Sequence, residues 1–309
     1  MSHRFGFFIL TAGFLTVAAC TPTPLQTVVP VTPTIPPAVA SATAIQSTTP
    51  AAAGASTPVT IAATKAAEMP AAPGLKIPTT GGAIHPAQVL NLTNWKITLP
   101  IGASGDTAGP PVEIAQPRLN TYSIAPYFIV SAGGNAVQFR APVKGATTSN
   151  SSYPRSELRE MTNNGAAAAN WSAIVGTHTM YVCEAITHLP DAKSVVMAAQ
   201  IHDDKTKVFD IRLSSQLLYV ESAEGKNVYT LDPAYVLGRI FTFRFVAGDG
   251  QINVYYNDGA NPVYTRRSDS PTNYFKAGVY TQSNCENETN CSASNYGEVL
   301  IYQLEVTHQ

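Results

Sequence analysis

Charged side chains are scarce in this sequence: they make up 13% of its 309 residues, and the formal net charge at pH 7 is -1. Without an excess of Lys and Arg there is no basic field to attract nucleic acid, so nucleic-acid binding is not expected. The six histidines lack the spacing of metal ligands, and the four cysteines include no CxxC pair. A bound metal is therefore not expected. No stretch keeps a capped helical period over three turns, which argues against a helical fold.

The N-terminus carries an apolar run from Phe5 to Ala19, preceded by His3 and Arg4. A membrane span needs about 20 apolar residues, so this run is too short to cross and instead matches a signal-peptide core. It ends in "LTVAAC", whose small residues before Cys20 resemble the bacterial lipoprotein processing box. We therefore expect a lipoprotein-type signal peptide over residues 1–20 and lipidation at Cys20, which would be the protein's sole membrane contact. Ordinary secretory cleavage is the alternative. Both alternatives predict that the protein is exported.

Composition then divides the rest of the chain. Residues 21–82 are rich in Thr, Pro, Ala and Val, and proline recurs too often for a helix or a central strand. This segment is predicted to be a disordered linker that holds a domain away from a surface. Residues 83–309 form the predicted globular domain. A lipid anchor would place that domain at the bacterial cell envelope or surface, although the side of the envelope is not readable.

The predicted domain consists of short alternating runs separated by Gly, Asn, Asp and Pro, which is typical of an all-β protein. "FTFRFVAGDGQINVYYN" (Phe241 to Asn257) reads as two strands around a tight turn, and "KVFDIRLSSQLLYVE" (Lys207 to Glu221) reads as another pair. Two packed antiparallel sheets are the simplest way to bury so many half-apolar strands. Cys285 and Cys291 bracket a short polar loop, and we expect a disulfide between them.

Three segments have one apolar face and one polar face: "YPRSELREM", "VVMAAQIHDD" and "YFKAGVYTQ". With the period of two of a strand, their polar faces carry Arg155, Glu157 and Arg159; Gln200 and His202; and Tyr274, Lys276, Tyr280 and Gln282. Each segment alone could be an ordinary solvated strand face with surface ion pairs. Together they would place cations, an amide and a His–Tyr pair on one sheet surface.

That set of groups suits the cleavage of a polymer of uronic acids. The C5 hydrogen of a uronate lies next to a carboxylate, and its removal builds charge on the carboxyl oxygens, which Arg155 and Gln200 could stabilise. His202 is the natural base for this proton, and Tyr280 is the natural acid for the leaving O4 oxygen. The bond would break by β-elimination without added water, metal or cofactor.

The same blocks resemble a known family. "RSELRE", "QIH" and "YFKAGVYTQ", in this order, resemble the signature blocks of alginate lyases of polysaccharide lyase family 7, and "NWKITLP" (Asn94 to Pro100) resembles that family's first strand. The resemblance spans about Asn91 to the C-terminus. It implies a β-jelly roll, a sandwich of two antiparallel sheets with a concave substrate-binding face, and alginate or a related poly-uronate as the substrate.

The resemblance also implies roles for individual residues. Arg155 and Gln200 would neutralise the substrate carboxylate, His202 would be the base and Tyr280 the acid; for mannuronate, Tyr280 could serve as both. Neighbouring sugars would be bound by Arg159, Lys276 and Gln282, while Glu157 would complete this binding set by pairing with the flanking cations. Thr281 stands where the family often has Asn. Ile201 in "QIH" indicates a preference for guluronate or mixed blocks.

Two other functions fit the same fold class. A lectin-like jelly roll would bind acidic polysaccharide without cleaving it, but the four candidate catalytic residues are all present. A glycoside hydrolase would need two suitably spaced carboxylic acids, and only Glu157 lies on the polar face. Endo or exo action and product length are not readable from motifs, and a monomer is the default expectation.

Overall fold

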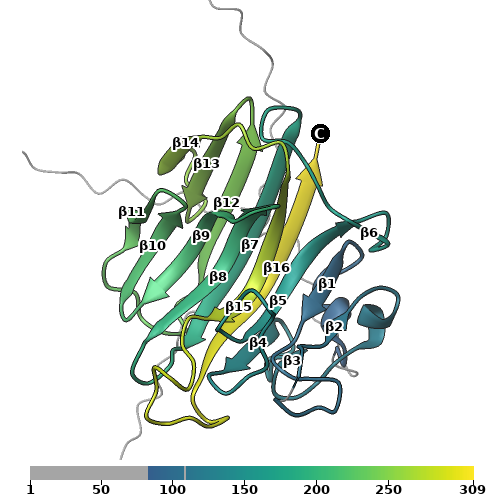
Figure 1. Cartoon of the computed structure of the whole chain (residues 1–309). Coiled ribbons are helices and arrows are strands. Elements are labelled where there is room, and N and C mark those ends of the chain that lie inside the picture. Colours follow the sequence, from purple (N-terminus) through teal and green to yellow (C-terminus); the bar gives the residue numbers. More distant parts are fainter. Residues whose placement is uncertain (1–82, 108) are drawn as a thin grey trace, which may run out of the picture. The chain divides into compact units, whose positions relative to one another are not determined.

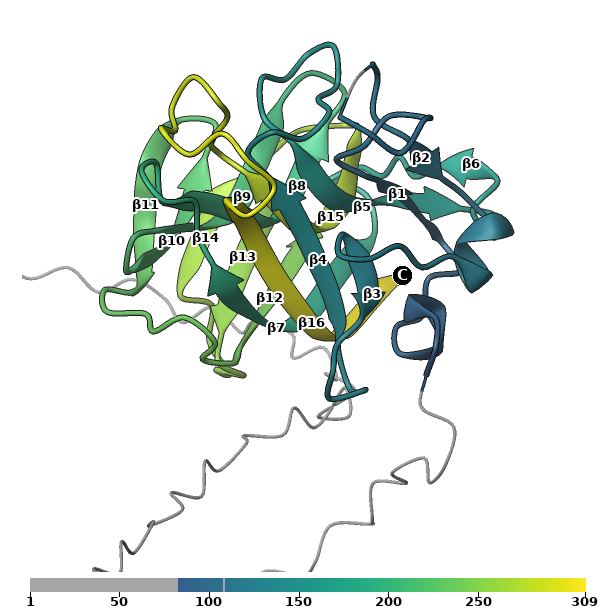
Figure 2. The same ribbon diagram turned by 90° about the horizontal axis from the view of Figure 1, so that it is seen from below.

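The computed structural model describes residues 83–107 and 109–309, and these form the sandwich of two antiparallel sheets predicted from the sequence. Figure 1 shows the strands, and Figure 2 shows the sheets as two layers. The predicted signal peptide, Cys20 and the linker lie outside the described residues. Within the described residues, no helix is long and apolar enough to cross a membrane.

The first sheet has nine strands, in the order β11-β10-β9-β8-β15-β5-β1-β2, with β6 beside β5. Its strands are β1 (Trp95–Thr98), β2 (Glu113–Ile114), β5 (Arg155–Thr162), β6 (Ala167–Ala168), β8 (Val195–Asp203), β9 (Lys207–Ser214), β10 (Leu217–Ser222), β11 (Gly225–Asp232) and β15 (Asn273–Thr281). The three polar segments of the sequence are therefore the adjacent strands β8, β15 and β5.

The second sheet has seven strands, in the order β14-β13-β12-β7-β16-β4-β3. Its strands are β3 (Phe128–Val130), β4 (Val137–Pro142), β7 (Thr177–His188), β12 (Phe241–Gly248), β13 (Gln251–Tyr256), β14 (Tyr264–Arg267) and β16 (Tyr296–His308). Two short 3-10 helices, η1 (Pro86–Gln88) and η2 (Arg118–Thr121), complete the described elements.

Both predicted strand pairs are present. β12 and β13 form a hairpin in which Asp249 and Gly250 have φ values of 51° and 72°. Positive φ at both central residues gives a turn whose twist matches the strands, which explains the Asp-Gly sequence. β9 and β10 pair in the same antiparallel manner. Local pattern and turn chemistry were therefore sufficient to predict these elements.

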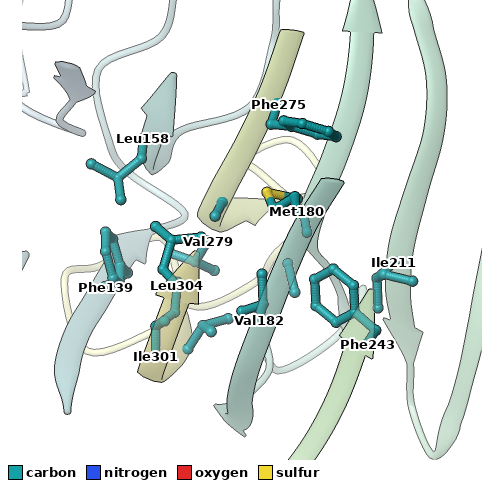
Figure 3. Packing of buried hydrophobic residues seen from close by; sticks show 14 of the residues in the cluster. Phe139, Leu158, Met180, Val182, Ile211, Phe243, Phe275, Val279, Ile301 and Leu304 are labelled. Carbon is teal, nitrogen blue, oxygen red and sulfur yellow. The ribbon is translucent and has the colours of Figure 1, made fainter. Parts of the chain in front are cut away.

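The core lies between the sheets and is built from the inward faces of the alternating strands. In β15, Phe275 and Val279 are fully buried, and Figure 3 shows them beside Met180 and Val182 of β7. Burying one large apolar side chain contributes about 1.5–3 kcal/mol, so each strand is held strongly with this face inward. A slip of one residue would expose these side chains, and the same constraint turns the polar residues of β15 outward.

A carboxyl group of β7 lies within this apolar core. Glu184 of β7 lies across from Phe241 and Ile301 and is fully buried, and neither of its oxygens has a hydrogen-bond partner within residues 83–107 and 109–309. Burial raises the pKa of Glu184 to about 8 because the charged form would lose its hydration. At neutral pH the group is therefore protonated, and it places no charge between the sheets.

Candidate active site

The three polar segments meet on the outer face of the first sheet. β15 lies between β5 and β8, with Tyr280 opposite Arg155 and Lys276 between Arg159 and Gln200. Residues directly opposite in an antiparallel pair point to the same side of the sheet. The structure therefore brings the polar residues of all three segments onto one face, which we call the site face.

A β-bulge on β15 refines this arrangement. Between Ala277 and Tyr280 the pairing with β8 shifts, so that one extra residue of β15 stands against that strand. Gly278 in the bulge has φ +128°, and a Cβ there would come within 2.6 Å of the Ser156 carbonyl oxygen. Only glycine fits this position. The extra residue in the bulge changes the position of Tyr280 relative to β8. A glycine inside a strand pattern was the available signal for this bulge.

Glu157 is the centre of the site face. Its carboxylate is 3% exposed and accepts bonds from Lys276 Nζ at 2.6 Å and Arg155 at 3.1 Å. Gln200 Nε2 donates to its other oxygen. Burial alone would raise the pKa of Glu157, but Lys276 and Arg155, together with the hydrogen bonds from Lys276 and Gln200, hold it below the usual value. Glu157 is therefore ionised and a poor proton donor, and it pairs with the flanking cations Arg155 and Lys276.

Cations outnumber carboxylates around Glu157. Arg155 and Lys276 both pair with the single carboxylate of Glu157, and Arg159 lies opposite Lys276 on β5. Arg155 Nε is buried without a hydrogen-bond partner among the described residues. Burial lowers the pKa of Lys276, and Glu157 opposes this shift. The surplus of positive charge and the free Arg155 donor favour an anionic ligand on the site face.

His202 is held in the tautomer that a base requires. Its Nδ1 lies 2.6 Å from the Asp203 carbonyl oxygen, which can only accept, so Nδ1 carries the proton of the neutral ring. Nε2 has no hydrogen-bond partner among the described residues. Burial lowers the pKa of His202, and Lys276 lowers it further, although the bond to Asp203 opposes them. The ring is therefore neutral at neutral pH, with Nε2 able to accept a proton.

Tyr274 positions this histidine. Its ring stacks on His202 with centroids 5.3 Å apart, and its hydroxyl lies 3.1 Å from Nδ1. The Arg159 guanidinium lies 4.0 Å from the centre of the Tyr274 ring. Burial raises the pKa of Tyr274 despite the opposing effect of Arg159, which keeps its hydroxyl protonated. The sequence placed Tyr274 on the polar face but gave no reason to assign it this role.

Tyr280 lies near the other end of β15. The Arg155 guanidinium covers its ring at 3.8 Å from the centroid, and its hydroxyl lies 2.5 Å from Ser151 Oγ. Arg155 also contacts Glu157, which links Tyr280 to the charged centre of the site face. Gln282, just beyond, is buried and donates to the Tyr280 carbonyl oxygen at 3.4 Å. Its predicted contact with substrate stays a prediction.

A disulfide joins Cys285 and Cys291, the pair predicted from the sequence. Inside this ring, Glu288 accepts hydrogen bonds from the backbone amides of Ala192 and Lys193 at 2.8 and 2.9 Å. The ring therefore holds the segment that leads into β8.

Lys193 and Tyr153 border the site face beside Tyr280. Lys193 Nζ lies 2.6 Å from the Tyr153 hydroxyl, and the rings of Tyr153 and Tyr280 have centroids 6.5 Å apart. Asn284, next to the disulfide ring, donates to the Ser152 carbonyl oxygen at 3.2 Å. The sequence did not predict these contacts, because they join segments far apart in the chain.

A second group of charges continues along the same sheet on β9 and β10. Lys207 and Arg212 are each paired with both Asp210 and Glu221. Asp210 lies opposite Gln200, which places this group beside Glu157. Its two cations are matched by two carboxylates, so this group adds no positive charge to the site face. The region around β5 and β15 is therefore the more favourable place for an anion.

A cavity of about 740 Å³ lies elsewhere, bounded by Trp95, Trp171 and the end of β16. Glu160, which points inward from β5, lies 2.6 Å from His308 Nε2 and accepts a bond from Trp171 Nε1 at 3.0 Å. These polar groups hydrogen-bond to each other and connect the two sheets, so the cavity is not the candidate active site.

Comparison with known proteins agrees with this geometry. Residues 90–308 match the family described as alginate lyase. This chain belongs to the alginate lyase family. A crystal structure of the alginate lyase from Corynebacterium sp. is 48% identical, with a TM-score of 0.71, and covers 74% of this chain and 100% of its own. The alginate lyase AlgAT5 from polysaccharide lyase family 7 is 46% identical, with a TM-score of 0.68 and the same two coverages.

More distant alginate lyases share the same fold. The alginate lyase of Klebsiella pneumoniae is 25% identical over 287 residues, which is 72% of this chain and 91% of that protein. A variant of the family 7 alginate lyase A1-II', in complex with the substrate GGMG, is 27% identical with a TM-score of 0.59 and covers 74% of this chain and 97% of its own. The predicted β-jelly roll is confirmed, and this chain is a polysaccharide lyase of the alginate lyase family.

Within the alginate lyase domain, the three blocks quoted from the sequence are the strands that carry the site face. "RSELRE" lies on β5, "QIH" on β8 and "YFKAGVYTQ" on and just beyond β15. Thr281, which differs from the family pattern, donates its hydroxyl proton to the Ala141 carbonyl oxygen of the other sheet and therefore faces the core. Among residues 83–107 and 109–309, no group of three or more His, Cys, Asp or Glu side chains could hold a metal ion.

Proposed function

We propose that this alginate lyase cleaves the polymer by β-elimination at 4-O-linked uronates. The observation that carries the proposal is the site face itself: a neutral histidine and a tyrosine stand on one sheet surface around a cationic centre. Solved relatives hold alginate oligosaccharides, such as the GGMG substrate of the A1-II' variant, and this supports a uronate polymer as the ligand.

The first task of the site is to stabilise negative charge on the substrate carboxyl group. Arg155 and Gln200 are assigned this role, because Glu157 holds both donors at the centre of the site face. As the C5 proton leaves, charge grows on the carboxyl oxygens, and donors already fixed in place stabilise it without reorganisation. Arg159, Lys276 and Gln282 are assigned to neighbouring sugars.

The second task is proton transfer. His202 Nε2 takes the proton from C5, the electrons of that C–H bond form the C4–C5 double bond, and the bond from C4 to O4 breaks. Tyr280 gives its hydroxyl proton to the departing O4 oxygen. The products are an unsaturated uronate end and a free hydroxyl end, with no water consumed. For mannuronate, where proton and leaving group lie on one side of the ring, Tyr280 would serve as both base and acid.

Guluronate or mixed blocks are the proposed preference, on the ground of Ile201 in "QIH". Ile201 is fully buried in the core, so it cannot touch a sugar on the site face. Its influence must therefore pass through the position of β8 and its neighbours Gln200 and His202. Initial rates on guluronate, mannuronate and mixed blocks would test this preference, and faster cleavage of pure mannuronate would contradict it.

The reaction itself is tested by mixing residues 83–309 with alginate and following ultraviolet absorbance. β-Elimination produces an absorbing unsaturated uronate together with new reducing ends, so we expect both to rise in proportion. New reducing ends without absorbance would indicate hydrolysis, and binding without either product would indicate a lectin. Each of these outcomes would contradict the proposal.

We also propose that the protein is exported and anchored by a lipid at Cys20. The support is the processing box that ends at Cys20, followed by the linker composition of residues 21–82. In a bacterial host, Cys20→Ala is expected to move the protein from the membrane fraction to the soluble fraction or to leave an unprocessed precursor. Membrane fractionation with labelling by a fatty-acid analogue measures both. Unchanged labelling in the Cys20→Ala variant would contradict lipidation.

A further inference from the structure

Ser151 makes the shortest side-chain contact of the candidate acid. It belongs to the loop before β5, and its Oγ lies 2.5 Å from the Tyr280 hydroxyl oxygen. The same Oγ accepts a hydrogen bond from the Tyr153 amide at 3.1 Å and lies 3.2 Å from the Tyr153 carbonyl oxygen. Ser151 is thus fixed on one side by backbone groups and faces the phenol on the other.

The hydrogen-bonding capacity of a serine decides what this arrangement can do. A hydroxyl has one proton and two acceptor positions. One acceptor position is taken by the Tyr153 amide, and the other can receive the Tyr280 proton while the serine proton goes to the Tyr153 carbonyl oxygen. If Tyr280 loses its proton, a rotation of the serine hydroxyl lets it donate to the phenolate oxygen instead. Both protonation states of Tyr280 can therefore be satisfied without moving a heavy atom.

We propose that Ser151 is a positioning residue for Tyr280, holding the phenol in place and donating a hydrogen bond to its oxygen once the proton has passed to O4. The inference rests on the proposed role of Tyr280 as the acid. In the elimination step the phenolic O–H bond breaks, the proton joins the leaving O4 oxygen, and the electron pair stays on the phenolate, which Ser151 stabilises. The Arg155 guanidinium, which covers the Tyr280 ring, also stabilises the negative charge of the phenolate.

The supporting structure around Ser151 favours this role over a merely local turn. The carbonyl oxygen of the next residue, Ser152, is held by Asn284, and Tyr153 is bonded through its hydroxyl to Lys193. The loop is thus held at the two residues that directly follow Ser151. Hydrogen bonds to a charged group are stronger than neutral ones, so the contribution of Ser151 is greatest when Tyr280 is deprotonated.

The test compares Ser151→Ala with Ser152→Ala, an exposed neighbour, as the matched control. For Ser151→Ala we expect kcat to fall about 10- to 100-fold with little change in KM, because the lost bond forms in the transition state. The alkaline fall of the pH–rate profile is expected to move upward by about one pH unit. Ser151→Thr, which keeps the hydroxyl, is expected to recover most of the rate. Ser152→Ala should match the wild type.

The Tyr280→Phe background separates this inference from the proposed function. There, Ser151→Ala should cause no further loss, since its partner oxygen is absent. An unchanged rate and pH profile in Ser151→Ala, alongside an inactive Tyr280→Phe variant, would overturn the inference and leave the proposed function intact. Full activity in Tyr280→Phe would overturn the proposed function itself. An equal loss in both backgrounds would show that Ser151 acts on something other than Tyr280, and this too would overturn the inference.

Discussion

Replacing Tyr280 by phenylalanine is expected to lower kcat on alginate by about 10³-fold, the usual scale for loss of a positioned general acid. The substitution removes only the hydroxyl, so the ring can still lie under Arg155. Substrate affinity should change little, because the groups assigned to the carboxylate, Arg155 and Gln200, remain held by Glu157. The rate is measured from the absorbance of unsaturated ends, and affinity by calorimetry with an alginate oligosaccharide.

Tyr229→Phe is the matched control, because Tyr229 lies on β11 away from the site face residues and is exposed. It should retain the wild-type kcat. If Tyr280→Phe kept a comparable rate, Tyr280 would not be the acid. If it lost substrate binding to the same extent as turnover, its role would be to hold the sugar rather than to donate a proton.

Glu157→Gln is expected to destabilise the fold by about 3 kcal/mol at pH 7, since it leaves Arg155 and Lys276 buried without their counter-charge. The same change should lower kcat about 100-fold, because misplacing Arg155 by a fraction of an ångström weakens its contact with the substrate carboxyl group. Denaturant unfolding measures the first effect and the absorbance assay the second.

The pH dependence of this difference has a defined sign. The pKa of Glu157 in the folded protein is below its ordinary value, because the neighbouring cations and hydrogen bonds outweigh the effect of burial. The stability it contributes is therefore complete above the ordinary carboxyl pKa, near 4.3, and is lost as the pH falls through the lower folded value. The free-energy gap between wild type and Glu157→Gln should narrow at pH 3. A gap that stayed constant from pH 7 to pH 3 would contradict this account.

Glu113→Gln provides the control for stability. Glu113 pairs with Lys96 on the same sheet, but its side chain is 49% exposed. An ion pair in water contributes about 0–1 kcal/mol, so this variant should unfold close to the wild type. Both glutamates lie in the first sheet and each pairs with a lysine. Comparing the two variants therefore tests whether burial of the ion pair determines its contribution to stability.

The sequence was most informative where the pattern is local. The alternation in "YFKAGVYTQ" predicted that Phe275 and Val279 would face the core and Lys276 and Tyr280 the other side, and the structure agrees. A period of two requires only neighbouring residues, which is why the faces could be assigned without knowing the strand order. The position of β15 between β5 and β8 could not be derived in this way, because strand order depends on contacts between segments far apart in the chain.

Features that depend on distant segments were not predicted. The contact between Ser151 and Tyr280 joins residues 129 positions apart, and the bond between Lys193 and Tyr153 joins two separate loops. Neither loop has a periodic pattern that would place its side chains. The bulge at Gly278 had a visible cause in the glycine, but its consequence depends on the backbone of β5 lying close by.

The ring closed by Cys285 and Cys291 has a consequence for when the enzyme becomes competent. Glu288 within it and Asn284 beside it hold the segments that enter β8 and β5, so one covalent loop sets the spacing of the two stretches that flank Tyr280. Such bonds form outside the reducing cytoplasm. If the protein is exported, as proposed, this spacing would become fixed only after the chain has left the cytoplasm.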